Sequence, residues 1–494
     1  MHIRTILAAI LLPAAIFTGE KGLAQAPLQL SVNAAKPGPA IAPTMWGIFF
    51  EDINFAADGG LYAELVKNRS FEFAVPMMGW DIPDKTPTGR ILIVNDAKNN
   101  AANPRYGRIT RDSAGGEFVL QNEGFRGIGV EKGKSYTFSA IGRTNGPAGL
   151  KLKISLLDEK GTEIGSATVP DFTGAWNKQT VTLSANGTAQ KGKLQLSFTG
   201  EGSVDIDMIS LFPKNTWMGR PNGLRRDLVQ KLADLKPGFI RFPGGCIVEG
   251  RDLANRYQWK KTVGATENRQ LIINRWNTEF SHKNAPDYFQ SFGLGFYEYF
   301  QLAEDLGAAP LPILNCGMAC QFNTGEVVSM EELDPFIQDA LDLIEFANAP
   351  VSTKWGKLRA DMGHPKPFNL TMMGVGNEQW DRQYIERYKI FEKVLKEKHP
   401  EIKLVSGSGP FSGGEWFDYA WKELKTSKVD FIDEHYYAPP NWFLTHANRY
   451  DTYDRKGPKV FAGEYAAHTK EDSVSESRNN WQSALAEAAF MTGL

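Results

Sequence analysis

Two glutamates, Glu378 and Glu464, occupy positions suited to acid–base chemistry. Glu378 lies in GVGNEQW (374–380) at the end of the apolar run FNLTMMGVG, and Glu464 directly follows the apolar run KVFAG. Both positions are typical of a carboxylate where a buried strand opens into a cleft. Either residue alone could be a salt-bridged strand end. Together they meet the requirement of glycoside hydrolysis, in which one acid protonates the leaving oxygen and one carboxylate faces the anomeric carbon.

The strands that carry these glutamates alternate with helix patterns from Trp217 onward, which predicts parallel strands joined by helical crossovers. With one earlier strand, the expected set is GIFFE (47–51), FIRFP (239–243), PLPILN (310–315), FNLTMMGVG (368–376), IKLVSG (402–407), VDFIDEHYY (429–437) and KVFAG (459–463). Glu378 then ends the fourth strand and Glu464 the seventh, at the C-terminal rim where barrel enzymes have their active sites. The predicted fold class is an α/β (β/α)8 TIM barrel that lacks its eighth strand in this chain.

An open, doubly wound sheet is the alternative to a barrel. Such a sheet binds nucleotides through a Gly-rich turn, and FPGG (242–245) is the only candidate for one. Neither GxGxxG nor GK[ST] spacing follows it, so nucleotide binding is not expected.

Helices are expected where the apolar spacing is helical. LYAELVKN (61–68) is predicted to form a helix after the first strand. Asn222 is expected to cap a helix whose apolar face runs from Leu224 to Leu235, and FYEYFQLAEDLG is expected to end at Gly307.

The helical period disappears between about Arg90 and Phe212. Short alternating runs such as SYTFSAIG, LKLKISLL and KLQLSF, bounded by Gly, Asn or Asp, predict an antiparallel β-sandwich of the jelly-roll kind. Such an insert could bind glycans or be purely structural. The expected division is an export signal (1–26), a strand at 28–32 and the first barrel strand and helix (27–89), the inserted sandwich (90–213) and the rest of the barrel (214–494).

The N-terminus resembles an export signal. His2 and Arg4 precede the apolar run TILAAILLPAAIF, and Ala24-Gln25-Ala26 supplies small residues for cleavage. The protein is therefore expected to be exported, to the periplasm or the exterior. No later segment reaches 18 uninterrupted apolar residues, and the formal net charge is −2, so neither a membrane nor a nucleic acid is expected as a partner.

Cysteine is scarce, with only Cys246, Cys316 and Cys320 in 494 residues. Cys316 and Cys320 could form a CxxxC metal pair, but their segment is apolar and has no His nearby, which favours buried free thiols. No ligand cluster in the sequence suggests a catalytic metal, and no cofactor is expected.

Several longer segments resemble the family 51 glycoside hydrolases, typically α-L-arabinofuranosidases. They are residues 49–72, residues 207–250, GVGNEQW, HYY (435–437) and FAGEY (461–465). The resemblance implies that Glu378 is the general acid/base and Glu464 the nucleophile. It also implies that the sandwich is a carbohydrate-binding-type insert of the subgroup shared by plant and some bacterial members.

The resemblance further implies four sugar-contacting residues. Asn377 matches the residue that binds the sugar 2-hydroxyl, and Glu51 one that holds other hydroxyls. Cys246 and Tyr437 match further contacts, although a shift of one residue would give the role of Tyr437 to Tyr436.

Two departures from the family pattern stand out. Phe55-Ala56-Ala57 replaces a loop that commonly resembles His-Ala-Gly, which affects the expected specificity. The chain also stops at EAAFMTGL, where the family continues into an eighth strand and a C-terminal β-sandwich.

The retaining mechanism predicts roughly 5 to 5.5 Å between the two carboxyl groups, a raised pKa for Glu378 and an ionised Glu464 surrounded by donors. His435 could tune the nucleophile or be a packed core residue. Arg241 could orient a carboxylate by a bidentate contact or form a structural ion pair. Asp433 and Glu434 are expected to be hydrogen-bond acceptors at a strand end.

The expected function is the release of terminal α-L-arabinofuranosyl residues from arabinan, arabinoxylan or derived oligosaccharides. Two alternatives remain: an endo-glucanase or xylanase on the same barrel, and a glycan-binding fragment without catalysis. An arabinose-containing plant polysaccharide or oligosaccharide is the expected partner, and the sequence predicts no oligomeric state.

Overall fold

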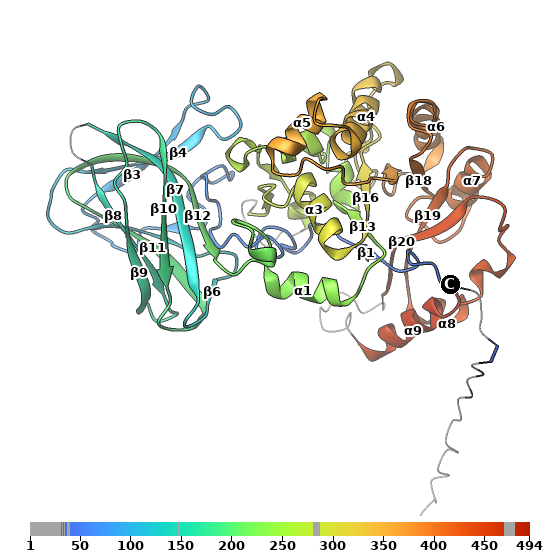
Figure 1. Ribbon diagram of the computed structural model, residues 1–494, viewed down its shortest axis with the longest axis horizontal. Coiled ribbons are helices and arrows are strands. Elements are labelled where there is room, and N and C mark those ends of the chain that lie inside the picture. Colours follow the sequence, from blue (N-terminus) through green and yellow to red (C-terminus); the bar gives the residue numbers. More distant parts are fainter. Residues whose placement is uncertain are drawn as a thin grey trace, which may run out of the picture. The chain divides into compact units, whose positions relative to one another are not determined.

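The computed structural model describes residues 31, 33, 35, 36, 40–146, 149–279, 287–468 and 480–494 (Figure 1). The elements below all belong to the compact unit Pro43–Leu494. The expected export signal (1–26) lies outside the described residues, as does nearly all of the strand expected at 28–32. No helix in the described part of the chain is both long and apolar enough to cross a bilayer.

Seven parallel strands form one sheet in the order β1-β13-β16-β17-β18-β19-β20. Their bounds are β1 Ile48–Phe49, β13 Phe239–Phe242, β16 Ala309–Leu314, β17 Met372–Val375, β18 Lys403–Gly407, β19 Phe431–Ala438 and β20 Lys459–Ala467. The spatial order equals the chain order, as in a (β/α)8 barrel, so the expected barrel fold is confirmed. Within the described residues no pairing joins β20 to β1.

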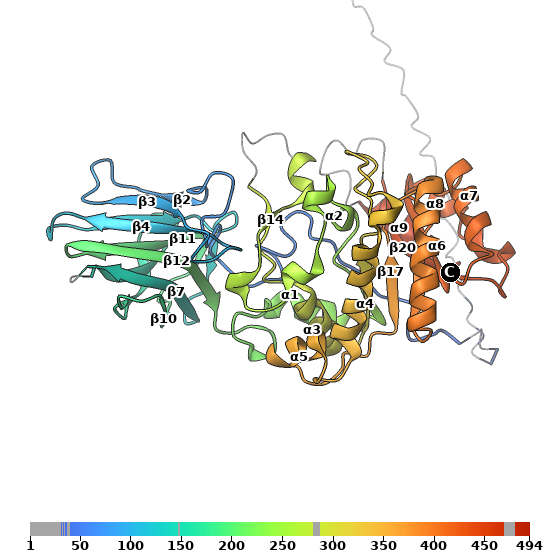
Figure 2. The same cartoon turned by 90° about the horizontal axis from the view of Figure 1, so that it is seen from above.

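Helices occupy the connections between these strands. Their bounds are α1 Arg226–Asp234, α2 Cys246–Glu249, α3 Phe296–Leu306, α4 Asp334–Asn348, α5 Lys354–Asp361, α6 Asp381–Lys398, α7 Glu415–Leu424, α8 Pro440–Thr445 and α9 Trp481–Met491. Short 3-10 helices are η1 Trp217–Gly219, η2 Leu253–Asn255, η3 Trp259–Thr262, η4 Thr266–Asn268, η5 Arg275–Glu279, η6 Met330–Glu332 and η7 Arg449–Thr452, and a small hairpin pairs β14 Ile272–Ile273 with β15 Phe289–Gln290. Figure 2 shows α4, β17 and α6 as neighbours, and all three contribute to one core cluster.

The ends of two helices test the capping predictions. Helix α3 is terminated by Gly307, as expected. This residue directly follows Leu306 and has a φ of 65°, the left-handed conformation that favours glycine. Helix α1 begins at Arg226, so Asn222 is not its cap. Asn222 itself has a φ of 53° and lies in a turn in which the Gly223 amide donates to the Arg220 carbonyl, which delays the helix by one turn.

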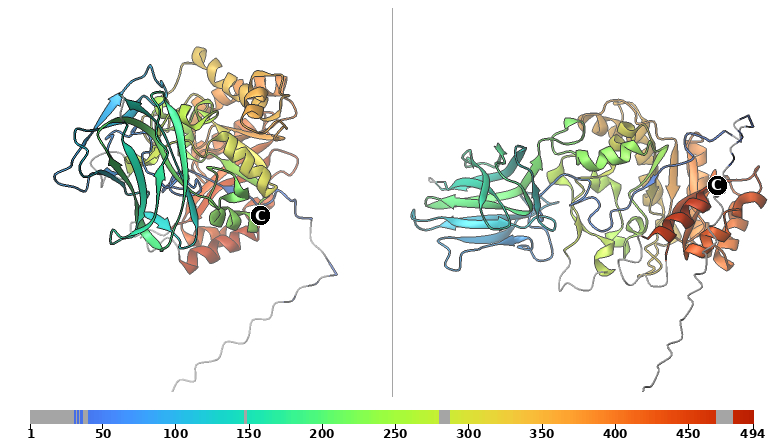
Figure 3. Two further views of the ribbon diagram at one scale, coloured as in Figure 1. Left: turned by 60° about the vertical axis from the view of Figure 1, so that its left-hand side comes forward. Right: turned by 90° about the horizontal axis from the view of Figure 1, so that it is seen from below.

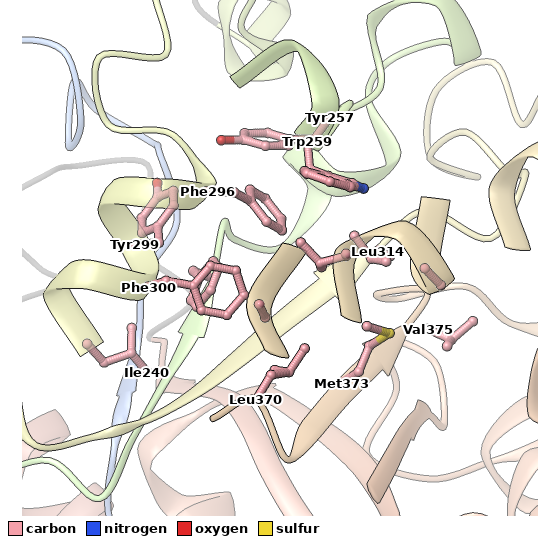
Figure 4. Close-up of a cluster of buried hydrophobic side chains, with 14 of the residues drawn as sticks. Ile240, Tyr257, Trp259, Phe296, Tyr299, Phe300, Leu314, Leu370, Met373 and Val375 are labelled. Carbon is pink, nitrogen blue, oxygen red and sulfur yellow. The ribbon is translucent and has the colours of Figure 1, made fainter. Parts of the chain in front are cut away.

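Alternation along the strands separates the outer core from the barrel interior. Ile240 of β13 faces outward into the large cluster that contains Phe296, Tyr299 and Phe300 of α3 (Figure 4). Phe242 belongs to the same cluster, and its ring contacts those three rings. A smaller cluster unites the inward-facing residues Leu311, Ile313 and Val405, with Met372, Phe431 and Phe461 packed against it. Because strand side chains alternate between faces, Arg241 points into the interior between its two apolar neighbours. The apolar interior cluster therefore gives way to charged residues further along the same strands.

The inserted sandwich consists of two antiparallel sheets, with strand orders β10-β7-β12-β4-β3 and β2-β5-β11-β8-β9, and β6 paired to β11 (Figures 1 and 3). The strands are β2 Trp80–Asp81, β3 Arg90–Asn95, β4 Arg105–Arg111, β5 Phe118–Asn122, β6 Ile128–Val130, β7 Ser135–Asn145, β8 Lys151–Leu157, β9 Glu163–Val169, β10 Asn177–Ser184, β11 Ala189–Thr199 and β12 Gly202–Pro213. A separate apolar cluster fills the space between the sheets. The expected sandwich is confirmed, and its first strand, β2, begins before Arg90.

The prediction of a helix at residues 61–68 is wrong. The segment is an irregular loop, because tertiary partners replace the helical hydrogen bonds: the Ala63 amide donates to the Gly223 carbonyl and the Leu65 amide to the Leu211 carbonyl. Leu61, Tyr62, Ala63 and Val66 are all buried, which a helix with one apolar face would not achieve.

Glu64 supports this loop from inside. Its Oε1 accepts from the amides of Leu65, Val66 and Leu211 at 2.8 to 3.0 Å, and its Oε2 lies 3.5 Å from Arg69 Nη1. Replacing Glu64 by Ala is expected to lower the free energy of unfolding by about 2 to 4 kcal/mol, because three amides lose their acceptor. Glu64→Gln keeps an accepting oxygen and should cost clearly less in denaturant unfolding. Equal losses in the two variants would show that the ion pair, not the amides, matters.

Candidate active site

Glu378 and Glu464 meet at the C-terminal end of the parallel sheet. Glu378 follows β17 and Glu464 lies within β20, and both are buried. One oxygen of each carboxylate and one ring nitrogen of His435 all lie within 4.8 Å of one another. This proximity fits the roughly 5 to 5.5 Å spacing of retaining glycosidases and not the roughly 6.5 to 9.5 Å of inverting ones.

The pairing of β19 with β20 brings Glu464 to this point. The register shifts between Glu434 and His435, so that His435 lies opposite Glu464. Gly463 is required here, because a Cβ on it would lie 2.2 Å from Asp433 Oδ1, to which its amide donates at 2.8 Å. Gly245 meets the same kind of limit, since its Cβ would lie 2.9 Å from Glu464 Oε1. The two glycines let carboxylates approach the backbone closely.

Arg241 is fully buried and connects several polar residues of the site. Its Nη1 donates to Glu464 Oε1 at 2.9 Å and to the Gly244 carbonyl at 3.2 Å. Its Nη2 donates to Asn377 Oδ1 at 2.8 Å and to Asp433 Oδ2 at 3.4 Å. Arg241 therefore bridges three side chains, which differs from the bidentate contact with one carboxylate that the sequence allowed.

His435 lies among three carboxylates. Its Nδ1 is 2.9 Å from Glu378 Oε1 and 3.9 Å from Glu464 Oε1, and its Nε2 is 3.3 Å from Asp433 Oδ2. Burial lowers the pKa of His435, but Glu464, Asp433 and the hydrogen bond to Glu378 outweigh burial and raise it well above its ordinary value. These contacts favour the protonated imidazole, so we assign His435 as an imidazolium that contacts the carboxylate pair rather than as a packing residue alone.

The charges of the two glutamates differ from the expectation. Burial raises the pKa of Glu378, but the hydrogen bond and charge of His435 outweigh it, and the net shift is downward. Burial raises the pKa of Glu464 beyond what His435 and Arg241 offset. The prediction of a raised pKa for Glu378 is therefore wrong for the free protein, because His435 Nδ1 lies 2.9 Å from Glu378 Oε1 and lowers the pKa of that carboxyl.

Alternation along β19 places Tyr436 and Tyr437 on opposite sides of the strand. Tyr437 faces the site and its hydroxyl donates to Glu464 Oε2 at 3.0 Å. Tyr436 and Glu434 face the opposite side, where Tyr436 donates to Glu434. Glu434 is indeed an acceptor, and Trp421 Nε1 also donates to it at 2.8 Å. Tyr436 and Glu434 therefore belong to the outer packing of the barrel.

The other predicted sugar contacts surround the glutamate pair. Cys246 Sγ donates to Glu378 Oε2 at 3.6 Å, and Asn377 accepts from Arg241. Glu51 follows β1 and accepts from the Ile247 amide at 3.4 Å. Burial and the charge of Glu464 raise the pKa of Glu51 to about 8. Five of the six residues singled out from the sequence are thus joined to the site by direct contacts or through Arg241, and Glu51 joins it through the amide of Ile247, the neighbour of Cys246.

Sequence patterns missed two further polar partners of the site. Trp276 in η5 donates through Nε1 to Glu51 Oε1 at 3.0 Å, and Glu249 in α2 accepts from Asn377 Nδ2 at 2.9 Å. Trp276 lies in a segment without regular periodicity, so no signal in the sequence pointed to it. Glu249 comes three residues after Cys246, and only the folded helix turn shows that it faces Asn377.

Phe55 is the first residue of the loop Phe55-Ala56-Ala57, which departs from the family pattern, and its ring lies beside that of Tyr288. Its ring centroid is 4.4 Å from that of Tyr288, and the Arg126 guanidinium lies 5.2 Å from the ring centre. Tyr288 donates to Asp52 Oδ1 at 2.5 Å, and the Ala57 amide donates to the same oxygen. The loop that follows Glu51 is therefore anchored by Asp52.

Comparison with known families gives two matches. Residues 231–455 match the α-L-arabinofuranosidase 1 domain, and residues 121–212 match the family 6 carbohydrate-binding module. The second match lies within the sandwich, and the first covers most of the barrel after β1.

Individual relatives are similar over almost the whole chain. An extracellular exo-α-L-arabinofuranosidase of Streptomyces chartreusis is 43% identical over 94% of this chain, which spans 55% of that protein's length. α-L-Arabinofuranosidase A of Aspergillus kawachii is 30% identical over 92% of this chain and 70% of its own. A solved structure named as an arabinose-bound family 51 α-L-arabinofuranosidase matches with a TM-score of 0.81 at 30% identity, covering 93% of this chain and 73% of its own.

Replacing Arg241 by Met is expected to destabilise the protein by about 3 to 5 kcal/mol, because the buried carboxylates of Glu464 and Asp433 lose the guanidinium that donates to both. Arg241→Lys keeps the charge but not the fork of donors, and should lose less stability. Thermal melting of the three proteins at one pH makes the comparison. A Met variant as stable as the parent would contradict the role assigned to this residue.

Replacing His435 by Gln is expected to cost most stability at about pH 6 and progressively less at higher pH. A group whose pKa is raised on folding stabilises the folded state fully below its unfolded pKa of about 6.5, and loses that contribution as the pH rises through its folded pKa. Melting midpoints of both proteins from about pH 6 to the alkaline range measure the difference. A difference that widens with pH would refute the imidazolium assignment.

Proposed function

The chain belongs to the family 51 glycoside hydrolases, among the α-L-arabinofuranosidases, and from this premise we propose that it releases terminal α-L-arabinofuranosyl residues by a retaining mechanism. The substrates are arabinan, arabinoxylan or oligosaccharides derived from them. The observation that carries the proposal is the approach of the Glu378 and Glu464 carboxylates to within 4.8 Å. That spacing is in the range of the retaining enzymes and shorter than that of the inverting ones, and so favours direct attack by one carboxylate.

Glu464 is the nucleophile in this proposal. Arg241 donates to its Oε1 at 2.9 Å and Tyr437 to its Oε2 at 3.0 Å, so both oxygens are oriented. In the first step a Glu464 oxygen bonds to the anomeric carbon while the bond to the leaving oxygen breaks. The two donors hold the carboxylate in place for this attack.

Glu378 is the general acid/base. The proton that it gives to the leaving oxygen is held in the free protein on His435 Nδ1, 2.9 Å from Glu378 Oε1. Moving this proton along the hydrogen bond makes Glu378 the acid and leaves His435 neutral, without changing the charge of the pair. In the second step the Glu378 carboxylate takes a proton from water, whose oxygen displaces Glu464 from the anomeric carbon.

Four neighbouring residues are proposed to bind the sugar. Asn377 is held between Arg241 and Glu249, so its amide orientation is fixed for a hydroxyl. Glu51 and Cys246 border the carboxylate pair, and Tyr437 is 47% exposed and marks an open side of the site. Hydrogen bonds to sugar hydroxyls that strengthen in the transition state would contribute to the rate.

The exo-arabinofuranosidase is favoured over an endo-glucanase or xylanase because the relatives are named as arabinofuranosidases, one of them exo-acting. A glycan-binding fragment without catalysis is disfavoured because both glutamates are held by hydrogen bonds, Glu378 by His435 and Glu464 by Arg241. The match of the sandwich to a carbohydrate-binding module supports a role in holding polysaccharide. Export is proposed because the Streptomyces relative is named as extracellular.

Kinetics of glutamate variants test the proposal. Glu464→Ala is expected to reduce kcat by at least about 10⁴-fold with every leaving group, because the covalent intermediate cannot form. Glu378→Ala is expected to lose about 10² to 10⁴-fold on substrates with poor leaving groups, and much less in the first step on activated aryl arabinofuranosides. Added azide should restore rate to the Glu378 variant and give a glycosyl azide of retained configuration, because Glu464 still forms the covalent intermediate.

The exposed residue Glu415 at the start of α7 gives a matched control, since Glu415→Ala removes a glutamate that is none of the six residues assigned to the site. Its kcat should equal that of the parent. Equal losses of the Glu378 variant on both leaving-group classes would contradict the acid/base assignment. Substantial turnover by the Glu464 variant would contradict the nucleophile.

A further inference from the structure

A second cluster of ligand-type side chains adjoins the carboxylate pair. One atom each from Cys246, Glu249 and Cys320 lies within 4.8 Å of the other two, and all three residues are buried. Cys246 and Glu249 stand three residues apart on the single turn α2, and therefore on one face of it. Cys320 reaches them from the loop after β16. The three cysteines of the chain are free thiols.

Two thiol sulfurs with one carboxylate are a donor set that selects zinc and similar thiophilic cations over magnesium or calcium. Zinc binds sulfur at about 2.3 Å and carboxylate oxygen at about 2.0 to 2.2 Å in a tetrahedral arrangement. Ligand atoms of one such site are thus roughly 3.5 to 4 Å apart, so the three side chains need to move by only about 1 Å. Three protein ligands leave a fourth position open.

The charge around the cluster also suits a divalent cation. Two thiolates and a carboxylate carry three negative charges, and Arg275 Nη2 donates to Cys320 Sγ at 3.8 Å. A divalent ion together with the Arg275 guanidinium would balance those charges in a buried site. Asn377 Nδ2 donates to Glu249 Oε2 at 2.9 Å, which is the kind of contact that orients a ligating carboxylate.

We propose that Cys246, Glu249 and Cys320 form a binding site for a thiophilic divalent cation of the zinc class, separate from the Glu378 and Glu464 pair. Occupancy of this site inhibits hydrolysis, a consequence that rests on the proposed function. The Cys246 thiol donates to Glu378 Oε2 at 3.6 Å, and a metal-bound thiolate has no proton to donate. The cation also places positive charge beside the group that must hold and release the proton.

Cadmium is a suitable probe, because cadmium–thiolate bonds absorb in the ultraviolet. The full chain is titrated with cadmium alone, in a phosphine reductant and without substrate. The parent protein is expected to bind one equivalent with a thiolate absorption band. Cys246→Ala and Cys320→Ala should each weaken binding at least about tenfold and reduce the band, and Glu249→Gln should weaken binding while keeping the band.

Cys316→Ala is the matched control, because Cys316 is equally buried, four residues before Cys320, and outside the cluster. It should bind cadmium as the parent does. Melting of each variant without metal shows that it folds. Inhibition by cadmium, measured relative to each variant's own metal-free rate, should weaken with the loss of binding.

Three outcomes would overturn the proposal. Unchanged cadmium binding in Cys320→Ala would do so. Stoichiometric binding without a thiolate band would place the ion on Glu378, His435 and Glu464, whose ligand atoms also lie within 4.8 Å of one another. Loss of two thiols without bound cadmium would indicate a Cys246–Cys320 disulfide instead. Because binding is measured without substrate, its failure is distinct from a failure to hydrolyse arabinofuranosides.

Discussion

The burial of one guanidinium, that of Arg241, is the constraint on which the site depends. A cation removed from water costs several kcal/mol unless hydrogen-bonded anions surround it. Arg241 meets Glu464, Asp433 and the Asn377 amide oxygen, and these come from β20, β19 and the end of β17. One buried charge therefore ties together three strands that are far apart in sequence. Correct assembly of these strands therefore also places the nucleophile.

The local sequence follows from that constraint. The glycines at 244, 245 and 463 leave space that carboxylates fill, since a Cβ at each would lie within 3 Å of Glu51, Glu464 or Asp433. The register shift between β19 and β20 sets His435 opposite Glu464. Alternation along β19 then directs Asp433, His435 and Tyr437 inward and Glu434 and Tyr436 outward. Few of these residues could therefore be substituted without disturbing a neighbour in the site.

The two glutamates have different cations as their nearest partners. Arg241 is permanently charged and fixes Glu464, whereas His435 can lose a proton and contacts Glu378 most closely. The same pair of carboxylates thus acquires different roles from the nature of its partners. In the free protein His435 lowers the pKa of Glu378, whereas burial raises the pKa of Glu464.

The sequence predicted the parts of the site that strand patterns and motifs specify. All seven barrel strands and the sandwich were predictable because their apolar periods and turn residues are strong. The segment 61–68 was not, because its helical spacing is overridden by partners such as Gly223 and Leu211 that only the fold supplies. The proximity of Cys246 to Cys320, and the lowering of the pKa of Glu378 by His435, depend on contacts across the barrel that no local pattern encodes.

Covalent labelling of the nucleophile tests the central claim most directly. A fluorinated arabinofuranoside with an activated leaving group slows hydrolysis of the glycosyl-enzyme, and mass spectrometry of a digest locates the attached sugar. The charge arrangement around Arg241 predicts one sugar per chain, on the peptide that contains Glu464. Labelling of Glu378 or Glu51 instead, with Glu464 unmodified, would contradict the account.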